Sequence, residues 1–296
     1  MNVLAASLTL GRGRMADWIE LTKPRITLLI LLTVLLGFYL GSGGGLGLLL
    51  LPTLAGTALI TSGVAVLNQV MERDLDARMR RTENRPLPAG RLRPTDARRF
   101  GLLLCLSGVA ALSLLVNPLT GGVAALTGVS YLGLYTPLKR VTSLSTLVGA
   151  FPGALPPVGG WTAATGELHA EAAILFGIVF LWQLPHFLAI AWLYQEDYRR
   201  AGVALLPGMA QAGHVAAGQV VLYTTALLPV SLLPAAVGLG GRLYLLAALL
   251  LGCLFLGEGL RFAFGRTTAA ARRLLLASII YLPLLWTALM IDQILP

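Results

Sequence analysis

Long apolar runs recur along the whole chain and constrain its fold more than any other feature. A transmembrane helix needs about 20 mostly apolar residues, and the sequence offers nine such stretches. We therefore predict an all-α, polytopic membrane protein, a nine-transmembrane-helix bundle that forms one domain over residues 1–296. The expected spans are 26–43, 48–70, 100–117, 119–137, 144–162, 172–194, 215–238, 242–262 and 273–294.

The composition excludes the main alternatives to a membrane protein. Only 12% of the 296 residues are charged, whereas an average soluble domain has about 25%. So few charges cannot cover the surface of a soluble globule of this size, and 56% hydrophobic residues exclude a disordered chain. The two cysteines lie inside apolar runs without ligating neighbours, which favours packing over a metal or redox site.

The placement of the positive charges orients the predicted bundle. Of the 22 Lys and Arg residues, 21 fall in the amino-terminal segment or in loops after even-numbered spans, and only Arg242 falls on the other side. The positive-inside rule then places the amino terminus in the cytoplasm and Pro296 outside. We expect residues 1–20 to form a cytoplasmic tail and the bundle to lie in a bacterial plasma membrane. The net charge of +9 thus reflects topology, and we expect no nucleic-acid partner.

The stretch NQVMERDLDARMRRTENRPLPAG, which begins at Asn68, is the most informative part of the sequence. Asn68, Glu72 and Asp76 are spaced four apart, so they fall within about 80° of one helix face, and Asp74 falls on the other side. Mg²⁺ prefers such oxygen ligands and usually shares them with substrate phosphates. The alternative is a polar helix end that meets water. Ionisable groups in membrane spans are usually functional, which favours the metal site.

Arginines follow this acidic face directly, before the segment that contains Pro86 and Pro88. A guanidinium beside a divalent metal is the arrangement expected for binding a diphosphate, since each neutralises a different set of oxygens. Several of these arginines are expected only to anchor the loop in the cytoplasm. We select Arg81 and Arg85, which lie on adjacent turns, as the diphosphate ligands.

The pattern NxxxExxxD followed by RTxxRPLPxG resembles the first acidic motif of the UbiA-type intramembrane prenyltransferases. The resemblance extends over nearly the whole chain and implies nine helices in the same orientation. It also implies that Asn68, Glu72 and Asp76 bind Mg²⁺ and the diphosphate of an isoprenoid donor, with Arg81 and Arg85 beside them. Lys139 and Arg140, after the fourth span, are implied to face the same diphosphate.

Further segments are similar to the haem-farnesylating branch of this family, the protohaem IX farnesyltransferases. They are LTKPRIT from Leu21, YTPLKRVTSLSTLVGAFPGALPPVGGW from Tyr135, WQLPHF from Trp182 and EDYRRAG from Glu196. The resemblance implies transfer of a farnesyl group from farnesyl diphosphate to a vinyl group of haem b, with hydration, which yields haem O and diphosphate for haem A and terminal oxidase biogenesis. Haem b is then a substrate rather than a permanent cofactor, and a haem A synthase is a possible partner.

The resemblance also marks substrate-binding candidates outside the acidic motif. Lys23, Arg25 and Arg140 are candidates for the haem propionates. His186 stands where many superfamily members begin a second acidic motif, so a full second set of acids is not expected. The complete set of candidates for substrate binding is Lys23, Arg25, Tyr135, Gln183, His186, Asp197 and Tyr198.

His186 has two interpretations that the sequence leaves open. A single histidine inside a span often packs with one hydrogen bond, whereas imidazole also ligates haem iron or donates to anions. Gln183, one turn earlier, is expected on the same helix face. Asp197 and Tyr198 lie at the cytoplasmic end of this helix, where a carboxylate can complete a magnesium site, and Glu196 is expected to be a solvated neighbour.

Two other functions remain open at this point. One is a UbiA-type transferase with an aromatic or quinone-precursor acceptor, against which LTKPRIT and WQLPHF argue. The other is a membrane transporter, whose signature is a pair of Gly- or Pro-broken spans in matching halves. The segment from Pro152 to Gly160 is such a break, but the second half of the sequence offers no counterpart.

Overall fold

Helices account for most of the chain that the structure describes. The computed structural model describes residues 15–203 and 209–294, and it contains no β-strand within those ranges. Residues 15–21 are helical and precede the first numbered element. The elements are α2 (Pro24–Gly41), α3 (Leu50–Met71), α4 (Arg73–Asp76), α5 (Pro94–Leu115), α6 (Pro118–Val129), the π-helix η1 (Ser130–Tyr135), α7 (Thr136–Leu138), α8 (Ser145–Thr165), α9 (Ala170–Leu193), α10 (Gln195–Ala201), α11 (Met209–Ala236), α12 (Arg242–Gly265) and α13 (Thr268–Ile294).

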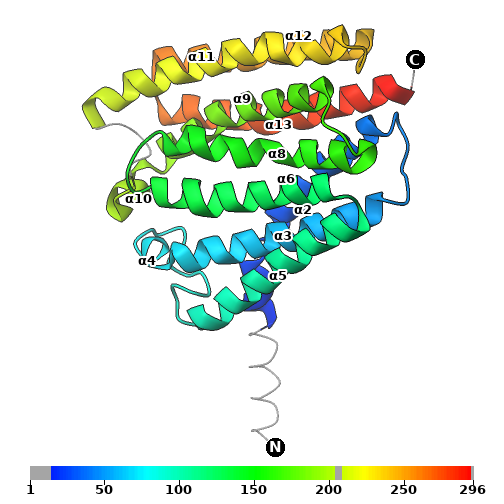
Figure 1. The fold of residues 1–296 in the computed structure, drawn as a ribbon. Helices are drawn as coiled ribbons and strands as arrows, with labels where there is room; N and C mark the ends of the chain where they lie inside the picture. Colours follow the sequence, from blue (N-terminus) through cyan, green and yellow to red (C-terminus); the bar gives the residue numbers. More distant parts are fainter. Residues whose placement is uncertain (1–14, 204–208, 295–296) are drawn as a thin grey trace, which may run out of the picture.

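The long helices run side by side as one bundle (Figure 1). Helices α3 and α5 lie at one edge of the view and α11 and α12 at the other, with α6, α8, α9 and α13 between them. The short helices α4 and α10 lie together at one end, and α13 ends at the opposite end. The loops that carry the acidic motif and EDYRRAG therefore meet at one end of the bundle.

Seven helices in the described residues are long and apolar enough to cross a membrane: α2, α3, α5, α9, the Gly213–Ala236 part of α11, α12 and α13. The expected span 119–137 is divided into α6, η1 and α7, and its longest piece has 12 residues. The expected span 144–162 is the 21-residue α8, which is rich in Gly, Pro and Thr. The all-helical membrane bundle is confirmed, and the count of nine spans stays a prediction.

Proline and small polar residues set where several helices begin. Pro24, Pro94 and Pro118 each occupy the first turn of a helix, where their missing N–H group leaves no hydrogen bond unmade. Asn117 caps α6, because its side-chain oxygen accepts a 2.8 Å hydrogen bond from the Thr120 backbone N–H. These signals fix the helix boundaries locally, before any tertiary packing.

Glycines allow two pairs of helices in the first half to approach closely. A Cβ atom on Gly63 of α3 would lie 2.7 Å from the Gly101 carbonyl oxygen of α5, and one on Gly108 would lie 2.6 Å from the Ile60 backbone nitrogen. A Cβ on Gly37 of α2 would likewise collide with the backbone of α8. Such backbone contact is how membrane helices associate without a hydrophobic driving force between them.

Large buried aromatic side chains fill the second half of the bundle. Tyr244, Phe255, Phe262 and Tyr281 are each at most 2% exposed and join one hydrophobic cluster of α2, α8, α9, α11, α12 and α13. The hydroxyl groups are satisfied, since Tyr244 donates to the Ser231 carbonyl and Tyr281 lies 2.6 Å from the Ser231 hydroxyl. This half is a closed core.

Part of the expected topology lies outside the described residues. That part comprises residues 1–14 of the expected cytoplasmic tail, with Arg12 and Arg14, and also Pro296.

Candidate active site

The acidic motif lies where α3 passes into α4. The helical hydrogen bonds continue through it, because the Glu72 N–H donates to the Asn68 carbonyl at 2.9 Å and the Asp76 N–H to the Glu72 carbonyl at 2.7 Å. The sequence suggested one unbroken helix, but α3 ends at Met71 and Glu72 links it to α4. Asn68, Glu72 and Asp76 are 2%, 7% and 3% exposed, so the motif forms a buried face.

Each acid of this face pairs with a cation from a distant part of the sequence or the following loop. Lys139 Nζ lies 2.8 Å from Glu72 Oε1, and Arg85 Nη1 lies 2.7 Å from Asp76 Oδ2. Asn68 Nδ2 donates to Thr136 Oγ1 at 3.2 Å. Buried carboxylates need such partners, because an unpaired charge away from water costs several kcal/mol. The structure thus brings together five of the residues that we selected from sequence for the chemistry: Asn68, Glu72, Asp76, Arg85 and Lys139.

The acidic face keeps oxygen atoms available for a metal ion. Among the described residues, Asn68 Oδ1, Glu72 Oε2 and Asp76 Oδ1 accept no hydrogen bond. The described part of the chain offers no cluster of three or more His, Cys, Asp or Glu side chains for a metal. Two carboxylates and one amide nevertheless fit Mg²⁺, which usually takes one or two protein carboxylates and completes its shell with water and substrate phosphates.

Lys23 faces the same cluster from the start of α2. It has a left-handed backbone conformation, with φ of 49°, at the boundary between helix 15–21 and α2. Burial and the nearby Arg85 and Lys139 lower its pKa to about 8, although Glu72 and Asp76 act in the opposite direction. The ammonium group of Lys23 is therefore short of a counter-anion in this arrangement.

Lys139 is held more firmly in its charged form. Burial alone lowers its pKa, but the surrounding Tyr135, Tyr131 and Glu72 outweigh burial and raise the pKa above its usual range. Its Nζ also lies 4.3 Å from the centroid of the Tyr135 ring, in cation–π geometry. Lys139 is thus a permanent positive charge beside Glu72.

Helix α10 packs over the loop that follows the acidic face. Leu75 and Met79 form a small buried cluster with Ala201, and Tyr198 packs against it. The Arg81 guanidinium lies 5.1 Å from the centroid of the Tyr194 ring. The contact explains why two loops that are 120 residues apart in the sequence meet at one end of the bundle in Figure 1.

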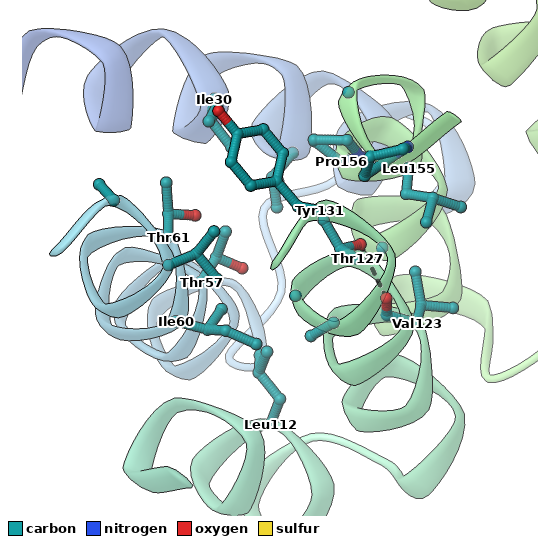
Figure 2. Close-up of a pocket in the computed structure, with 18 of the residues that line it drawn as sticks. Ile30, Thr57, Ile60, Thr61, Leu112, Val123, Thr127, Tyr131, Leu155 and Pro156 are labelled. Carbon is teal, nitrogen blue, oxygen red and sulfur yellow. Dashed lines mark hydrogen bonds between the residues drawn. The ribbon is translucent and has the colours of Figure 1, made fainter. Parts of the chain in front are cut away.

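An apolar cavity of about 220 Å³ begins beside this polar cluster (Figure 2). It lies between α2, α3, α5, α6, η1 and α8, and Lys23 and Tyr131 line it at the polar end. Figure 2 shows Thr57 and Thr61 on one wall, Val123 and Thr127 on the other, and the Tyr131 ring reaching toward Ile30. The charged cluster and the apolar cavity are therefore adjacent parts of one site.

His186 and Gln183 make contacts with different helices, contrary to the shared face expected from sequence. His186 Nδ1 lies 2.8 Å from the Ser278 hydroxyl of α13, and its ring stacks on Trp182 at 5.2 Å. Gln183 Nε2 instead donates to the Ala150 carbonyl of α8 at 2.6 Å. Neither residue lines the cavity.

The remaining candidates lie nearer the surface of the same end. Arg140 is exposed and donates to the Met71 carbonyl at 3.4 Å, and Arg25 is exposed. Asp197 accepts from Arg200 at 2.6 Å, while Glu196 is 58% exposed and pairs with Arg199, as a solvated neighbour should. Asp74 is 75% exposed and contacts Arg73, so it lies off the acidic face as predicted.

Three residues of the site were missed by sequence reasoning. Thr136 positions the Asn68 amide, Thr82 donates to the Asp76 carbonyl at 2.8 Å, and Tyr131 lines the cavity. Thr82 and Thr136 lie inside the segments RTENRPLPAG and YTPLK, so their place in a motif was the available signal. Tyr131 lies in the π-helix, an irregularity that is frequent at functional sites and carries no simple sequence signal.

Comparison with known proteins gives this geometry a context. The sequence pattern described as the UbiA prenyltransferase family matches residues 30–286. The protoheme IX farnesyltransferase of Solibacter usitatus is 50% identical over 289 residues, which cover 94% of this chain and 99% of the relative. The protein of the same name in Koribacter versatilis is 44% identical over 288 residues and covers 94% and 93%.

Solved structures share the fold. One, from a study of digeranylgeranylglyceryl phosphate synthase in membranes, has a TM-score of 0.80 and 17% identity and covers 96% of this chain and all of that chain. Another, a UbiA homolog from Archaeoglobus fulgidus bound to GPP and Mg²⁺, has a TM-score of 0.60 and 15% identity and covers 92% and 99%. At these identities the likeness establishes the arrangement of helices.

Proposed function

The chain belongs to the UbiA prenyltransferase family, and on this premise we propose that it transfers a farnesyl group from farnesyl diphosphate to a vinyl group of haem b. Water adds in the same reaction, and the products are haem O and diphosphate. The near full-length relatives named protoheme IX farnesyltransferase support this acceptor and donor. One structural observation carries the proposal: a buried acidic face with free oxygen atoms adjoins an apolar cavity.

The polar end of the site binds the donor diphosphate in this proposal. Asn68, Glu72 and Asp76 would hold Mg²⁺, which when bound neutralises the charge of the diphosphate and promotes its departure. Lys139 and Arg85, already beside these acids, supply positive charge to the departing oxygens. In the proposal, Arg81, Arg140 and Lys23 add further positive charge around the same diphosphate. The UbiA homolog bound to GPP and Mg²⁺ supports the metal and the class of donor.

The apolar cavity holds the farnesyl tail and keeps water from the reacting carbon. The C1–O bond of the donor breaks and its electron pair leaves with the diphosphate. The vinyl group of haem then forms a bond to C1, and water adds to the adjoining carbon with loss of one proton to solvent. The lining residues exclude bulk water, so the allylic cation reaches the vinyl group before it is quenched.

The acceptor site is the less defined part of the proposal. Lys23, Arg25 and Arg140 are the proposed partners of the haem propionates, with Tyr135, Gln183, Asp197 and Tyr198 as further substrate contacts. The hydrogen bond between His186 and Ser278 favours a packing role for His186. The positive-inside rule supports a cytoplasmic mouth in a bacterial plasma membrane, with the carboxyl terminus outside. Haem O leaves the site for the next enzyme of haem A formation, and a haem A synthase is the proposed recipient.

The test is direct. Membranes that contain the protein are incubated with haem b and farnesyl diphosphate, with and without Mg²⁺, and the extracted pigments are analysed by mass spectrometry. We expect a pigment heavier than haem b by one farnesyl group plus one hydroxyl group, formed only when Mg²⁺ is present. No mass increase would refute the acceptor, and formation that persists after chelation of metals would refute the role of the acidic face.

A further inference from the structure

We propose that the buried end of the cavity, formed by Leu112 of α5 with Thr120 of α6, sets the longest isoprenoid chain that the enzyme accepts. This inference rests on the proposed function in one respect, since it takes a prenyl diphosphate to be the donor. It concerns chain length, which neither the acidic face nor the choice of acceptor determines.

The residues that line the cavity are more exposed near the polar cluster than at the opposite end. Near the polar cluster its wall contains Ile26, which is 52% exposed, and the half-buried Lys23. At the other end, Leu112 and Thr120 are 1% and 2% exposed, and Val34 is 1% exposed. A chain that enters at Lys23 therefore meets buried side chains and backbone at the far end rather than lipid.

The length of the cavity can be measured along two of the segments that line it, and both give the same value. Its lining runs from Lys23 to Val34 on α2, and from Tyr131 back to Thr120 along η1 and α6. At 1.5 Å per residue, eleven residues correspond to about 16 Å. That distance is of the order of an extended fifteen-carbon chain, so a donor longer by one isoprene unit has no space unless the end recedes.

The buried end is held in place by packing and by hydrogen bonds. A Cβ atom on Gly56 of α3 would lie 2.7 Å from Leu112 Cγ, so Leu112 packs directly on that backbone. The Thr120 hydroxyl lies 3.0 Å from the Thr162 hydroxyl, and Asn117 Nδ2 donates to the Thr162 carbonyl at 2.9 Å. These bonds tie α6 to α8 behind the cavity, so a longer chain cannot displace the floor easily.

Two substitutions should change the accepted length in opposite directions. Leu112→Ala removes the side chain at the buried end, whereas Ala124→Leu fills the channel one turn nearer its mouth. Leu106→Ala is the matched control, because Leu106 lies on the same helix α5 and is 69% exposed. Loss of stability alone cannot shift the preferred donor to a longer chain in one variant and to a shorter chain in the other.

The experiment has two readouts. Each protein receives haem b with an equimolar mixture of geranyl, farnesyl and geranylgeranyl diphosphates, and the prenylated haems are separated by mass. Since one methylene changes discrimination about 10- to 200-fold, we expect Leu112→Ala to raise the ratio of C20 to C15 product by at least about tenfold. Ala124→Leu should raise the ratio of C10 to C15 product similarly, and Leu106→Ala should match the wild type.

Thermal unfolding with each diphosphate and Mg²⁺ forms the second readout, and it does not involve haem. One outcome is that the wild-type protein prenylates no haem and is still stabilised most against thermal unfolding by the fifteen-carbon diphosphate. That result would refute haem as the acceptor. The inference on chain length would then be tested by comparing the thermal stabilisation of the variants. If Leu112→Ala does not fold, Ala124→Leu decides. Wild-type chain-length profiles in the folded variants, or shifts in the same direction, would overturn the inference.

Discussion

The two halves of the bundle solve the packing of membrane helices in different ways. In the half formed by α2, α3, α5, α6 and α8, glycines bring backbones together and leave an apolar cavity beside buried charges. In the half formed by α9, α11, α12 and α13, large aromatic side chains such as Tyr244 and Tyr281 fill the interior, and the hydroxyl groups of these two residues are hydrogen-bonded. In the proposed function, the first half binds the donor and the second half supports it.

The largest expected effect is the loss of activity when a carboxylate of the acidic face in the first half is removed. Glu72→Gln or Asp76→Asn removes one carboxylate of the acidic face, and we expect Mg²⁺-dependent formation of prenylated haem to fall by about 10³-fold. Asp74→Asn is the matched control, because Asp74 belongs to the same motif but is 75% exposed. Rates are measured on equal amounts of folded protein, since loss of a carboxylate leaves Lys139 or Arg85 unpaired. Full activity in either acid variant would remove its role.

His186 tests where the boundary between the halves lies. His186→Ala loses the hydrogen bond to Ser278 and the stacking on Trp182, so we expect the free energy of unfolding to fall by about 2 kcal/mol. Haem affinity and turnover per folded molecule should stay at the wild-type level. Ser278→Ala removes the same hydrogen bond from the other side and should be destabilising too. Reduced haem affinity at unchanged stability would instead assign His186 to the substrate site.

The smallest expected effect is a change with pH in the affinity for farnesyl diphosphate, which depends on the charge of Lys23 in the first half. The pKa of Lys23 is lowered to about 8 by burial and by neighbouring cations. A lysine loses its charge as the pH rises through its pKa, so its attraction for a diphosphate is present below about pH 8 and is lost above it. We expect the affinity for farnesyl diphosphate to fall by a few-fold, roughly the loss of one weak ion pair, between pH 7 and pH 9. Lys23→Met should abolish this pH dependence, and a slope that persists in that variant would contradict the assignment.

Local sequence patterns predict the structural features that depend on residues close together in the sequence. Apolar run lengths gave the long helices, and the spacing of Asn68, Glu72 and Asp76 gave the acidic face. The pairing of Glu72 with Lys139 joins residues 67 apart and depends on how the helices pack, so the sequence indicated a shared diphosphate site but not this ion pair. The π-helix and the buried end of the cavity also depend on tertiary packing.

His186 illustrates the same limit within a single helix. Residues three apart lie near one another on a helix, which favoured a common face for Gln183 and His186. Their partners lie on α8 and α13, because each side chain turns toward the nearest group that satisfies it. Side chains three residues apart point about 60° apart around a helix, and the neighbouring helices determine which groups each one meets.

The glycine contacts between α3 and α5 have a consequence for the position of the site. Where backbones touch at Gly63 and Gly108, α3 cannot slide along its partner without placing a side chain against a peptide group. Because α4 continues from α3, the position of Asn68, Glu72 and Asp76 relative to α5 is fixed by the same contacts. The position of the charged acidic face along α5 is therefore determined by side chains that each consist of a single hydrogen atom.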